Sequence, residues 1–407
     1  MQIRSARRWF CWALRRLASV EGLFPLSVDN FDFLYLAVLV TFWGNIVTEL
    51  QHSSEGLNLR IDIFDEVGIG GGASGVSGGL LHPYSPKAKL LWRGAECWKE
   101  CLMLLSIAER AAFSEESNFE LGQPGQCFDS FIVRRRGLLR PATSMKNLNV
   151  LLDNAQNCVA SCRIETIGKE TAQKLVPNIC LPFNSAFYMP QAVNVHPLHY
   201  LQALFVACKN LVKELSTSSH GLKELYLHKK SVQKLIEFEG EYDAVIICLG
   251  AKADMLSELS GRLPLRTCRG VIAHLQLPGN IREEYADHAP SILSDAWFAV
   301  QGTRSLLMGS TWEWKSRNSS ANVSADEASR ALEELLPKVS AFYPGIKDWT
   351  FTGAKAGLRA MPPLTPQDHF RFWAVSMILL VTIVSVNTGY LVDWVHGVCC
   401  TMLGLGI

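Results

Sequence analysis

The stretch "RIDIFDEVGIGGGASGVSGGLLHPY" (residues 60–84) joins a strand pattern, an acidic pair and a glycine-rich turn. Apolar and polar residues alternate over 59–64, which predicts a half-buried β-strand that ends at Asp65 and Glu66. An acid at the end of such a strand in a nucleotide-binding sheet accepts hydrogen bonds from ribose hydroxyls. Its register with the strand end favours Asp65 for this role, and an ordinary acidic turn after an edge strand is the alternative.

The turn that follows is typical of a loop that lines a ligand. Residues 68–79 contain seven glycines, which let a backbone approach a ligand closely, and successive backbone N–H groups there can bind an anion. Ser74 could add a hydroxyl to a phosphate oxygen. A flexible linker is the alternative, but a linker does not continue directly into "LLHPY" and a long helix.

A second nucleotide-site signal is "EGEYDAVIICLGAKAD" (residues 239–254). Residues 244–249 are a continuous apolar run of the kind that is buried on both faces of a parallel sheet, and the run stops at Gly250. We expect a strand at 243–248, where Gly250 lets the backbone pass close to a ligand. A plain core strand would give the same pattern.

Composition sets the broad class of the protein. The chain has 407 residues, 48% of them apolar, which is enough for two domains of ordinary size or one large α/β unit, with a sizeable core. Its net charge of +1 does not indicate nucleic acid as a partner. The twelve cysteines form no CxxC pair and no Cys/His ligand set, so no metal site is indicated, and they suit a reducing compartment as buried thiols.

The periodicity of residues 57–367 predicts strands and helices in a recognisable order. Further strands are expected at 131–134, 225–228, 232–238, 269–276, 297–301 and 305–309, and helices at 87–112, 197–215 and 325–341. Ser324 and Glu327 match a capping box at the start of the last helix. This order predicts an α/β (α+β) fold, in which a Rossmann-like nucleotide-binding domain carries an inserted antiparallel-sheet domain.

Both ends of the chain differ from the middle. Residues 1–20 carry five arginines and no acid, which fits a chloroplast or mitochondrial transit peptide or a helix on an anionic membrane face. Residues 33–47 are uncharged but shorter than the roughly 20 residues that span a bilayer, and a buried strand and turn is equally consistent. The 21 uncharged residues 372–392 are long enough to span, with a buried element as the alternative.

Several motifs taken together resemble one flavoenzyme superfamily. Asp65, "GGGASGVSGG" (70–79), "YMPQAVNVHPLHYLQAL" (188–204) and "YDAVIICLGA" (242–251) occur in this order in the D-amino-acid oxidase, glycine oxidase and sarcosine oxidase superfamily of FAD-dependent oxidoreductases. "PLRTCRGVIAHLQLP" (264–278) and "GAKAGLRAMPPLTP" (353–366) complete the series. The wording of residues 72–84 is most similar to the oxidase domain of the bifunctional tRNA 5-methylaminomethyl-2-thiouridine enzyme and its uncharacterised plant relatives.

The resemblance implies three groups of FAD-binding residues. The group around the adenosine comprises Asp65, which holds the ribose, Glu66, Val232, which contacts adenine from a short strand, and Gly250. The group beside the pyrophosphate comprises Gly72, Ala73 and Ser74. The group near the flavin ring comprises Gly79, Leu80 and His82.

It also implies the reaction. Arg269 and Gly270 would begin the strand that leads into the substrate sheet, and Arg359 would lie beside the flavin or a substrate carboxylate. Arg359 and His82 are the catalytic candidates, while His196 and His199 suit either bases or packing residues. The implied chemistry is hydride transfer from a carbon next to an amine nitrogen to FAD, followed by reoxidation by molecular oxygen.

Two parts of the superfamily's pattern are missing from the sequence. The superfamily opens with a strand and a GxGxxG turn whose helix N-terminus binds the pyrophosphate, and here "LAVLVTFWGNIV" (36–47) holds Gly44 alone. The match also stops after Pro366, where the superfamily has a turn and helix over the flavin. Three lost charge-assisted hydrogen bonds, at about 1.5–3 kcal/mol each, would weaken binding by roughly three to six orders of magnitude. We therefore expect poor FAD binding.

The expected function is an FAD-dependent oxidoreductase that acts on a small amine or amino-acid-like substrate in an organelle or the cytoplasm. A defective or membrane-tethered relative, and an NAD(P)-dependent dehydrogenase, are the alternatives. We expect five parts along the chain. Residues 1–49 are an atypical segment, 50–130 and 197–260 form the FAD-binding domain, and 131–196 and 261–352 form the substrate domain. Residues 353–367 return to the FAD-binding domain, and 368–407 are a hydrophobic tail.

Overall fold

The computed structural model describes residues 59–361 except 92–93, 114–130, 219–221, 243–244, 246, 264 and 282–284. The expectations for residues 1–20, 33–47 and 372–392, and for the two missing parts of the superfamily's pattern, lie outside these described residues. Within them, every helix is too short or too polar to cross a bilayer.

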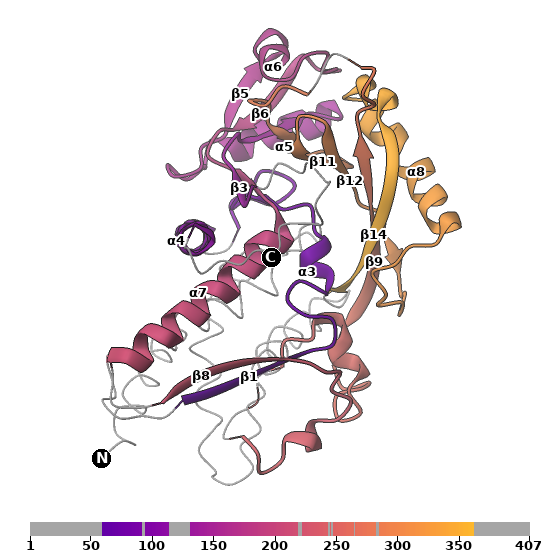
Figure 1. The fold of residues 1–407 in the computed structure, drawn as a ribbon. Coiled ribbons are helices and arrows are strands. Elements are labelled where there is room, and N and C mark those ends of the chain that lie inside the picture. Colours follow the sequence, from indigo (N-terminus) through magenta and orange to yellow (C-terminus); the bar gives the residue numbers. More distant parts are fainter. Residues whose placement is uncertain are drawn as a thin grey trace.

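A two-stranded parallel sheet carries the predicted acid. It pairs β1 (Leu59–Asp65) with β8 (Lys223–Lys229), in register from their first residues to their last. Helix α7 (Pro197–Ser218) covers one face of this sheet, where Leu215 packs on Ile61 (Figure 1). Among the described residues β1 pairs only with β8, so its other edge has no strand beside it.

A second, mostly antiparallel sheet forms the rest of the fold. Its strand order is β13-β9-β12-β11-β10-β4-β6-β5. Strands β12 and β13 pair with different parts of β9, and β14 pairs with β9 along its whole length. The bounds are β4 Leu138–Pro141, β5 Glu165–Gly168, β6 Ser185–Met189, β9 Arg266–Gln276, β10 Ser291–Ile292, β11 Trp297–Gly302, β12 Ser305–Gly309, β13 Glu313–Trp314 and β14 Thr350–Met361. A smaller sheet between the two consists of β2 (Leu80–Leu81), β7 (Val193–Val195) and β3 (Val133–Arg134).

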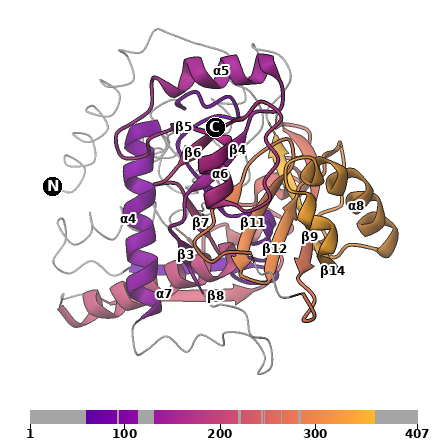
Figure 2. The same cartoon turned by 90° about the horizontal axis from the view of Figure 1, so that it is seen from above.

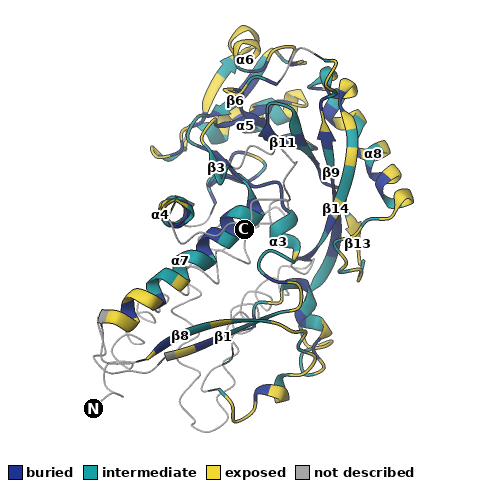
Figure 3. Cartoon of the chain, in the orientation of Figure 1, coloured by how far each residue is buried: buried dark blue, intermediate teal, exposed yellow. Residues whose placement is uncertain are grey.

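The helices cover these sheets. Their bounds are α3 Ala73–Val76, α4 Gly94–Ala112, α5 Met145–Ala155, α6 Lys169–Leu175 and α8 Ala325–Ser340, with short 3-10 helices η1 Leu235–Phe238, η2 Gly250–Met255 and η3 Pro344–Asp348. Viewed from above, α4 crosses α7 (Figure 2). Helix α8 lies outside β9 and β14 and exposes its outer side to solvent, while β9 is largely buried (Figure 3).

The two faces of the β9–β14 pair look in opposite directions. Val271 and Ala273 pack with the α8 residues Ala331 and Leu335, respectively. Side chains alternate along a strand, so the residues between them face away from α8. We call the side opposite α8 the inner face. On β9 it carries Gly270, Ile272 and His274, and on β14 it carries their respective partners Gly357, Lys355 and Gly353, together with Arg359, which pairs with Cys268.

The predicted fold class is confirmed, as are the helices near 197–215 and 325–341 and the strands near 59–64, 225–228, 269–276, 297–301 and 305–309. The strand expected at 131–134 is only two residues long. The helix expected at 87–112 begins at Gly94, because residues 85–91 form a turn in which Ala88 has a φ of 58°.

Two strand predictions are wrong. Leu235–Phe238 form a 3-10 helix, because the Glu237 carboxylate accepts hydrogen bonds from the backbone N–H groups of Gln233 and Lys234, at 3.0 and 3.1 Å. Val232 therefore lies in an unpaired segment. In the strand expected at 243–248, the described residues 245, 247 and 248 belong to no strand.

Candidate functional site

Asp65 lies at the carboxyl end of β1, as the sequence predicts. Its Oδ1 accepts hydrogen bonds from the backbone N–H groups of Val67 and Gly68, at 2.9 and 2.7 Å, so the carboxylate holds its own turn in place. Its carbonyl accepts from Lys230 N at 3.1 Å, which joins the end of β8 to the same point. In the described part of the chain, Oδ2 has no donor and is left for a ligand hydroxyl.

Glu66 gathers the other residues implied for the adenosine. Its carboxylate forms an ion pair with Lys252 and accepts a hydrogen bond from the Ser231 side chain. The hydrogen bond from Lys252 is the main reason that the pKa of Glu66 is lowered. Val232 adjoins Ser231, and Gly250, which has a φ of 53°, begins the short helix that carries Lys252. Asp65, Glu66, Val232 and Gly250 therefore come together, although Val232 does so without the expected strand.

The glycine turn fits closely between α7 and β14. A Cβ on Gly70 would lie 2.6 Å from a methyl carbon of Leu198 in α7, and one on Gly357 would lie 2.9 Å from the Cα of Ala73. These contacts place α3, with Ala73 and Ser74, directly against the inner face (Figure 1). Gly72 instead has open space where a Cβ would be, so the turn presents bare backbone there.

The segment after the turn is held equally tightly. Gly79 has a φ of 73°, and a Cβ there would lie 2.0 Å from the carbonyl oxygen of Val195. A Cβ on Gly78 would lie 2.5 Å from the indole of Trp297 in the large sheet. Leu80 then pairs with Asn194 across β2 and β7. The residues implied near the flavin ring thus lie where the small sheet meets the large one.

The environment of His82 does not favour a role as a base. Desolvation, followed by the nearby positive charge of Arg140, lowers the pKa of His82 to about 3, although part of the residue remains in contact with solvent. A group with so low a pKa takes up a proton poorly near neutral pH. Its Nδ1 accepts a hydrogen bond from Tyr84 N at 3.3 Å, which supports a positioning role.

Arg359 lies on the inner face in a fixed position. Its Nη2 donates to Ser310 Oγ at 2.5 Å, its Nη1 donates to the Thr311 carbonyl at 3.3 Å, and its guanidinium lies 4.5 Å from the centre of the Trp312 ring. Gly270 lies beneath it, where a Cβ would come within 2.1 Å of Nη2. The sheet therefore holds a buried cation on the side that faces the glycine turn.

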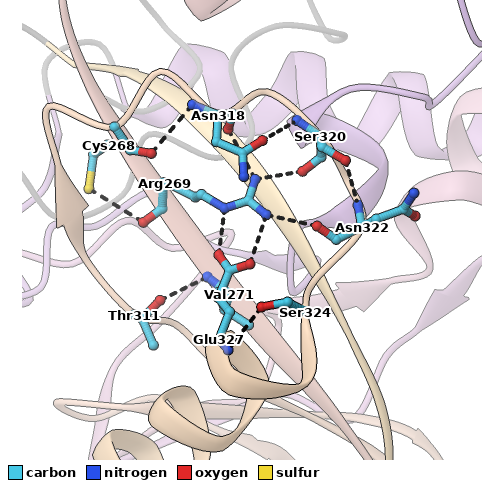
Figure 4. A network of polar contacts seen from close by, with 10 residues as sticks. Cys268, Arg269, Val271, Thr311, Asn318, Ser320, Asn322, Ser324 and Glu327 are labelled. Carbon is cyan, nitrogen blue, oxygen red and sulfur yellow. Dashed lines mark hydrogen bonds and ion pairs between the residues drawn. The ribbon is translucent and has the colours of Figure 1, made fainter.

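Arg269, which lies on the adjacent strand β9 and on the opposite face of the sheet from Arg359, is a structural residue. Its guanidinium is fully buried and donates to the Glu327 carboxylate and to the carbonyls of Asn318, Ser320 and Asn322 (Figure 4). Ser324 caps α8 as expected, but Glu327 binds Arg269 instead of reaching back to the cap. The strand of Arg269 begins earlier than expected, at Arg266.

Sequence reasoning missed three inner residues of this region. His274 and Lys355 lie on the inner face because of the β9–β14 register, which no single segment reveals. Asn194, in β7, is buried, and its Oδ1 has no hydrogen-bond partner in the described part of the chain. That oxygen lies 3.1 Å from the position of a Cβ on Gly79, beside the segment implied near the flavin.

These residues fit two of the three parts of an FAD site. Asp65 Oδ2 and the segments at 231–232 and 250–252 suit the adenosine, and the unpaired acceptor of Asn194 beside Gly79 suits a donor on the flavin ring. The fit of the diphosphate depends on residues before 59, which the structure does not describe. No group of three or more His, Cys, Asp or Glu within the described ranges is placed to hold a metal ion.

Comparison with known proteins agrees with this reading. A family model described as "FAD dependent oxidoreductase" (DAO) matches residues 48–390. No curated protein sequence matches. Iminodiacetate oxidase from Chelativorans sp. BNC1 superposes with a TM-score of 0.55 at 16% identity, over 81% of this chain and 82% of that one.

Two further solved structures share the fold. Glycine oxidase from Geobacillus kaustophilus has a TM-score of 0.57 at 15% identity, over 93% of this chain and 94% of that one. L-α-glycerophosphate oxidase from Mycoplasma pneumoniae, solved with FAD bound, has a TM-score of 0.52 at 12% identity, over 81% of each chain. At these identities the likeness establishes the fold.

Proposed function

The chain belongs to the DAO family of FAD-dependent oxidoreductases, and from this premise we propose that it oxidises a C–N bond of a small amine or amino-acid-like substrate. FAD is the cofactor of this family. The family match favours flavin over the nicotinamide alternative. Kinship with the tRNA-modifying oxidase domain, location in an organelle and attachment to a membrane through 372–392 stay predictions.

One observation supports the proposal most strongly: three distant segments meet at the carboxyl ends of β1 and β8. Asp65 is bonded to Lys230 N, and Glu66 is bonded to Ser231 and Lys252. Ligands of open α/β sheets bind at this end of the strands. In this proposal Asp65 and its neighbours hold the adenosine, Gly72, Ala73 and Ser74 run beside the pyrophosphate, and Gly79 and Leu80 lie near the flavin ring.

When bound, FAD would supply the acceptor for a hydride from the carbon next to the substrate nitrogen, with molecular oxygen as the final acceptor. The chain's own residues would position the substrate. Arg359 presents a fixed positive charge on the inner face, which suits the carboxylate of an amino-acid-like substrate. His82 would keep its neutral form there, because desolvation lowers its pKa to about 3.

The second candidate is a relative that turns over little or no substrate. It is favoured by the described residues 245, 247 and 248, which the sequence predicts as part of a strand and which belong to none. This candidate agrees with weak FAD binding.

Anaerobic reduction of added FAD tests the proposal. The full chain is mixed with FAD, and glycine, sarcosine or iminodiacetate is added while the flavin absorbance near 450 nm is followed, with air admitted at the end. We expect at least one amine to bleach the flavin and air to restore it. If FAD binds but no amine of this class bleaches it, the inactive relative is the better description.

A further inference from the structure

A group of basic side chains lies on the inner face, apart from the residues assigned to FAD. Lys355 lies on β14, two residues before Gly357, and is paired with Ile272 of β9. His274 lies two residues further along β9, on the same face. His196, directly after β7, and His199, in the first turn of α7, stack on each other, with imidazole centres 3.7 Å apart and nearly parallel. We call these four residues the basic cluster.

We propose that the basic cluster binds a second anionic group of the substrate, a carboxylate or a phosphate, so that the enzyme prefers extended substrates with a negative charge at the end remote from the amine. This inference rests on the proposed oxidoreductase function, because it assigns the substrate class of the same site.

The strand geometry places the cluster where a substrate could reach it. Gly357, between Lys355 and Arg359, is the residue whose backbone contacts Ala73 in the glycine turn. Lys355 and Arg359 are four residues apart on one face of β14, which separates their Cα atoms by roughly 13 Å. A small amino acid at Arg359 could not touch Lys355, whereas an extended substrate could.

The cluster is formed from both walls of the site. His196 follows Val195, whose carbonyl oxygen crowds Gly79, so it adjoins the segment implied near the flavin ring. The positive charge of Lys355 acts on both His196 and His274, which places the two walls within electrostatic reach of each other. The exposed side chain of Lys355 leaves the cluster open to solvent on one side.

Two imidazoles of the cluster, His196 and His274, lie among positive neighbours. Desolvation is the main cause that lowers the pKa of His196 to about 3 and of His274 to about 4, and positive neighbours lower both further. No carboxylate appears among the largest influences on either imidazole in the described part of the chain. A bound anion would supply a negative charge and hydrogen-bond acceptors for the N–H groups of the cluster.

A metal ion is a poorer occupant than an anion. The described histidines, cysteines and carboxylates include no group of three placed to hold a metal, and a lysine beside the imidazoles would repel a cation. The backbone N–H groups that open α7 add positive partial charge on the same side as His199. The chemistry of the cluster therefore selects anionic oxygen atoms.

Inorganic phosphate tests the cluster without any need for turnover. Calorimetric titration of the full chain with phosphate should give saturable binding, and Lys355→Gln should weaken it roughly tenfold or more, as expected for one lost charge-assisted contact. The matched control is Lys347→Gln, which removes an exposed lysine of η3 and should leave the affinity unchanged. His274→Gln should weaken binding as well.

Substrate pairs then distinguish the inference from the proposed function. Two amines of equal length, with and without a terminal carboxylate, are compared in the wild type and Lys355→Gln. The inference predicts that the substitution raises KM roughly tenfold for the carboxylated amine alone. The inference that the basic cluster binds an anion is contradicted if Lys355→Gln raises KM equally for both amines. It is also contradicted if Lys355→Gln binds phosphate as tightly as the wild type. Phosphate binding that depends on Lys355 but no turnover of any amine overturns only the proposed reaction.

Discussion

Arg269 and Glu327 form a two-point ion pair that joins β9 to α8, with Nε–Oε1 at 2.6 Å and Nη2–Oε2 at 3.2 Å. The remaining donors of the guanidinium bond to the carbonyls of residues 318, 320 and 322, so all of its N–H groups are used (Figure 4). The helix and the loop before it are therefore fixed to the strand whose other side forms the site.

Removing one partner of this pair should strongly destabilise the protein. Glu327→Ala leaves the buried guanidinium of Arg269 without its counter-charge, which costs about 3–5 kcal/mol in free energy of unfolding. Glu334→Ala is the matched control on the same helix, since Glu334 forms a partly exposed pair with Lys338 that contributes about 0.3–0.5 kcal/mol. Urea unfolding measures both, and equal losses would show that the buried pair contributes little.

The same pair should make the free energy of unfolding depend on pH. The hydrogen bond from Arg269 is the main cause that lowers the pKa of Glu327 in the folded state. Its contribution is therefore complete above the unfolded pKa of about 4.3 and is lost as the pH falls through the folded pKa. The difference in unfolding free energy between wild type and Glu327→Gln should be constant from pH 7 to 5 and shrink below pH 4. A difference that stays constant to pH 3 would contradict this cause.

The buried imidazoles should weaken the fold in mild acid. His274 has a folded pKa of about 4, below the unfolded value of about 6.5, so the unfolded chain binds the proton more readily. Unfolding free energy should fall as the pH decreases from 6.5 towards 4, with at most about 1.4 kcal/mol per pH unit for each such group. His274→Asn should flatten this slope in urea titrations at pH 7, 6 and 5, and an unchanged slope would show that His274 does not contribute.

Anion binding at the basic cluster should strengthen in the same pH range. An anion beside His196 and His274 raises their low pKa values, so binding takes up protons. Phosphate affinity should therefore increase as the pH falls from about 6.5 towards 4, as these imidazoles take up protons. Calorimetry in two buffers of different ionisation enthalpy measures the proton uptake, and proton release would contradict the cluster.

Comparing alanine variants of Gly79 and Gly240 distinguishes the cost of a positive φ from the cost of a steric clash. Both have positive φ, 73° and 77°, but a Cβ on Gly79 would lie 2.0 Å from Val195 O, while one on Gly240 would meet nothing within 4 Å. Gly240→Ala should cost only the left-handed penalty of about 1–2 kcal/mol. Gly79→Ala should cost clearly more and displace the segment at 79–82. Equal urea midpoints for the two variants would show that the close approach at Gly79 is easily relieved.

Local sequence patterns predict the parts of this fold that each segment determines by itself. The alternation over 59–64 gives β1 and its terminal acid, and the 3.6-residue periodicity gives α7 and α8. The convergence of Asp65, Glu66, Val232 and Gly250 follows from the family resemblance and matches the structure, because the ends of parallel neighbouring strands meet at one edge.

Local sequence patterns do not predict the elements that depend on residues distant in the sequence. The apolar run at 244–249 is typical of a buried strand, yet its described residues 245 and 247–249 belong to none. β14 contains small residues with low strand propensity, and it is stabilised by pairing with β9 along its whole length. The basic cluster likewise arises from strand register and from the approach of α7, which no local motif encodes.

Equilibrium titration with FAD tests the central claim, that Asp65 and the turn behind it bind the cofactor. Asp65→Asn keeps the Oδ1 acceptor for Val67 and Gly68 but replaces the Oδ2 left for the ribose, and Asp348→Asn, in exposed η3, is the control. We predict weak, saturable quenching of flavin fluorescence by the wild type and Asp348→Asn, and affinity reduced roughly tenfold or more in Asp65→Asn. Equal affinity for all three proteins, or no saturable binding by the wild type, would contradict the account.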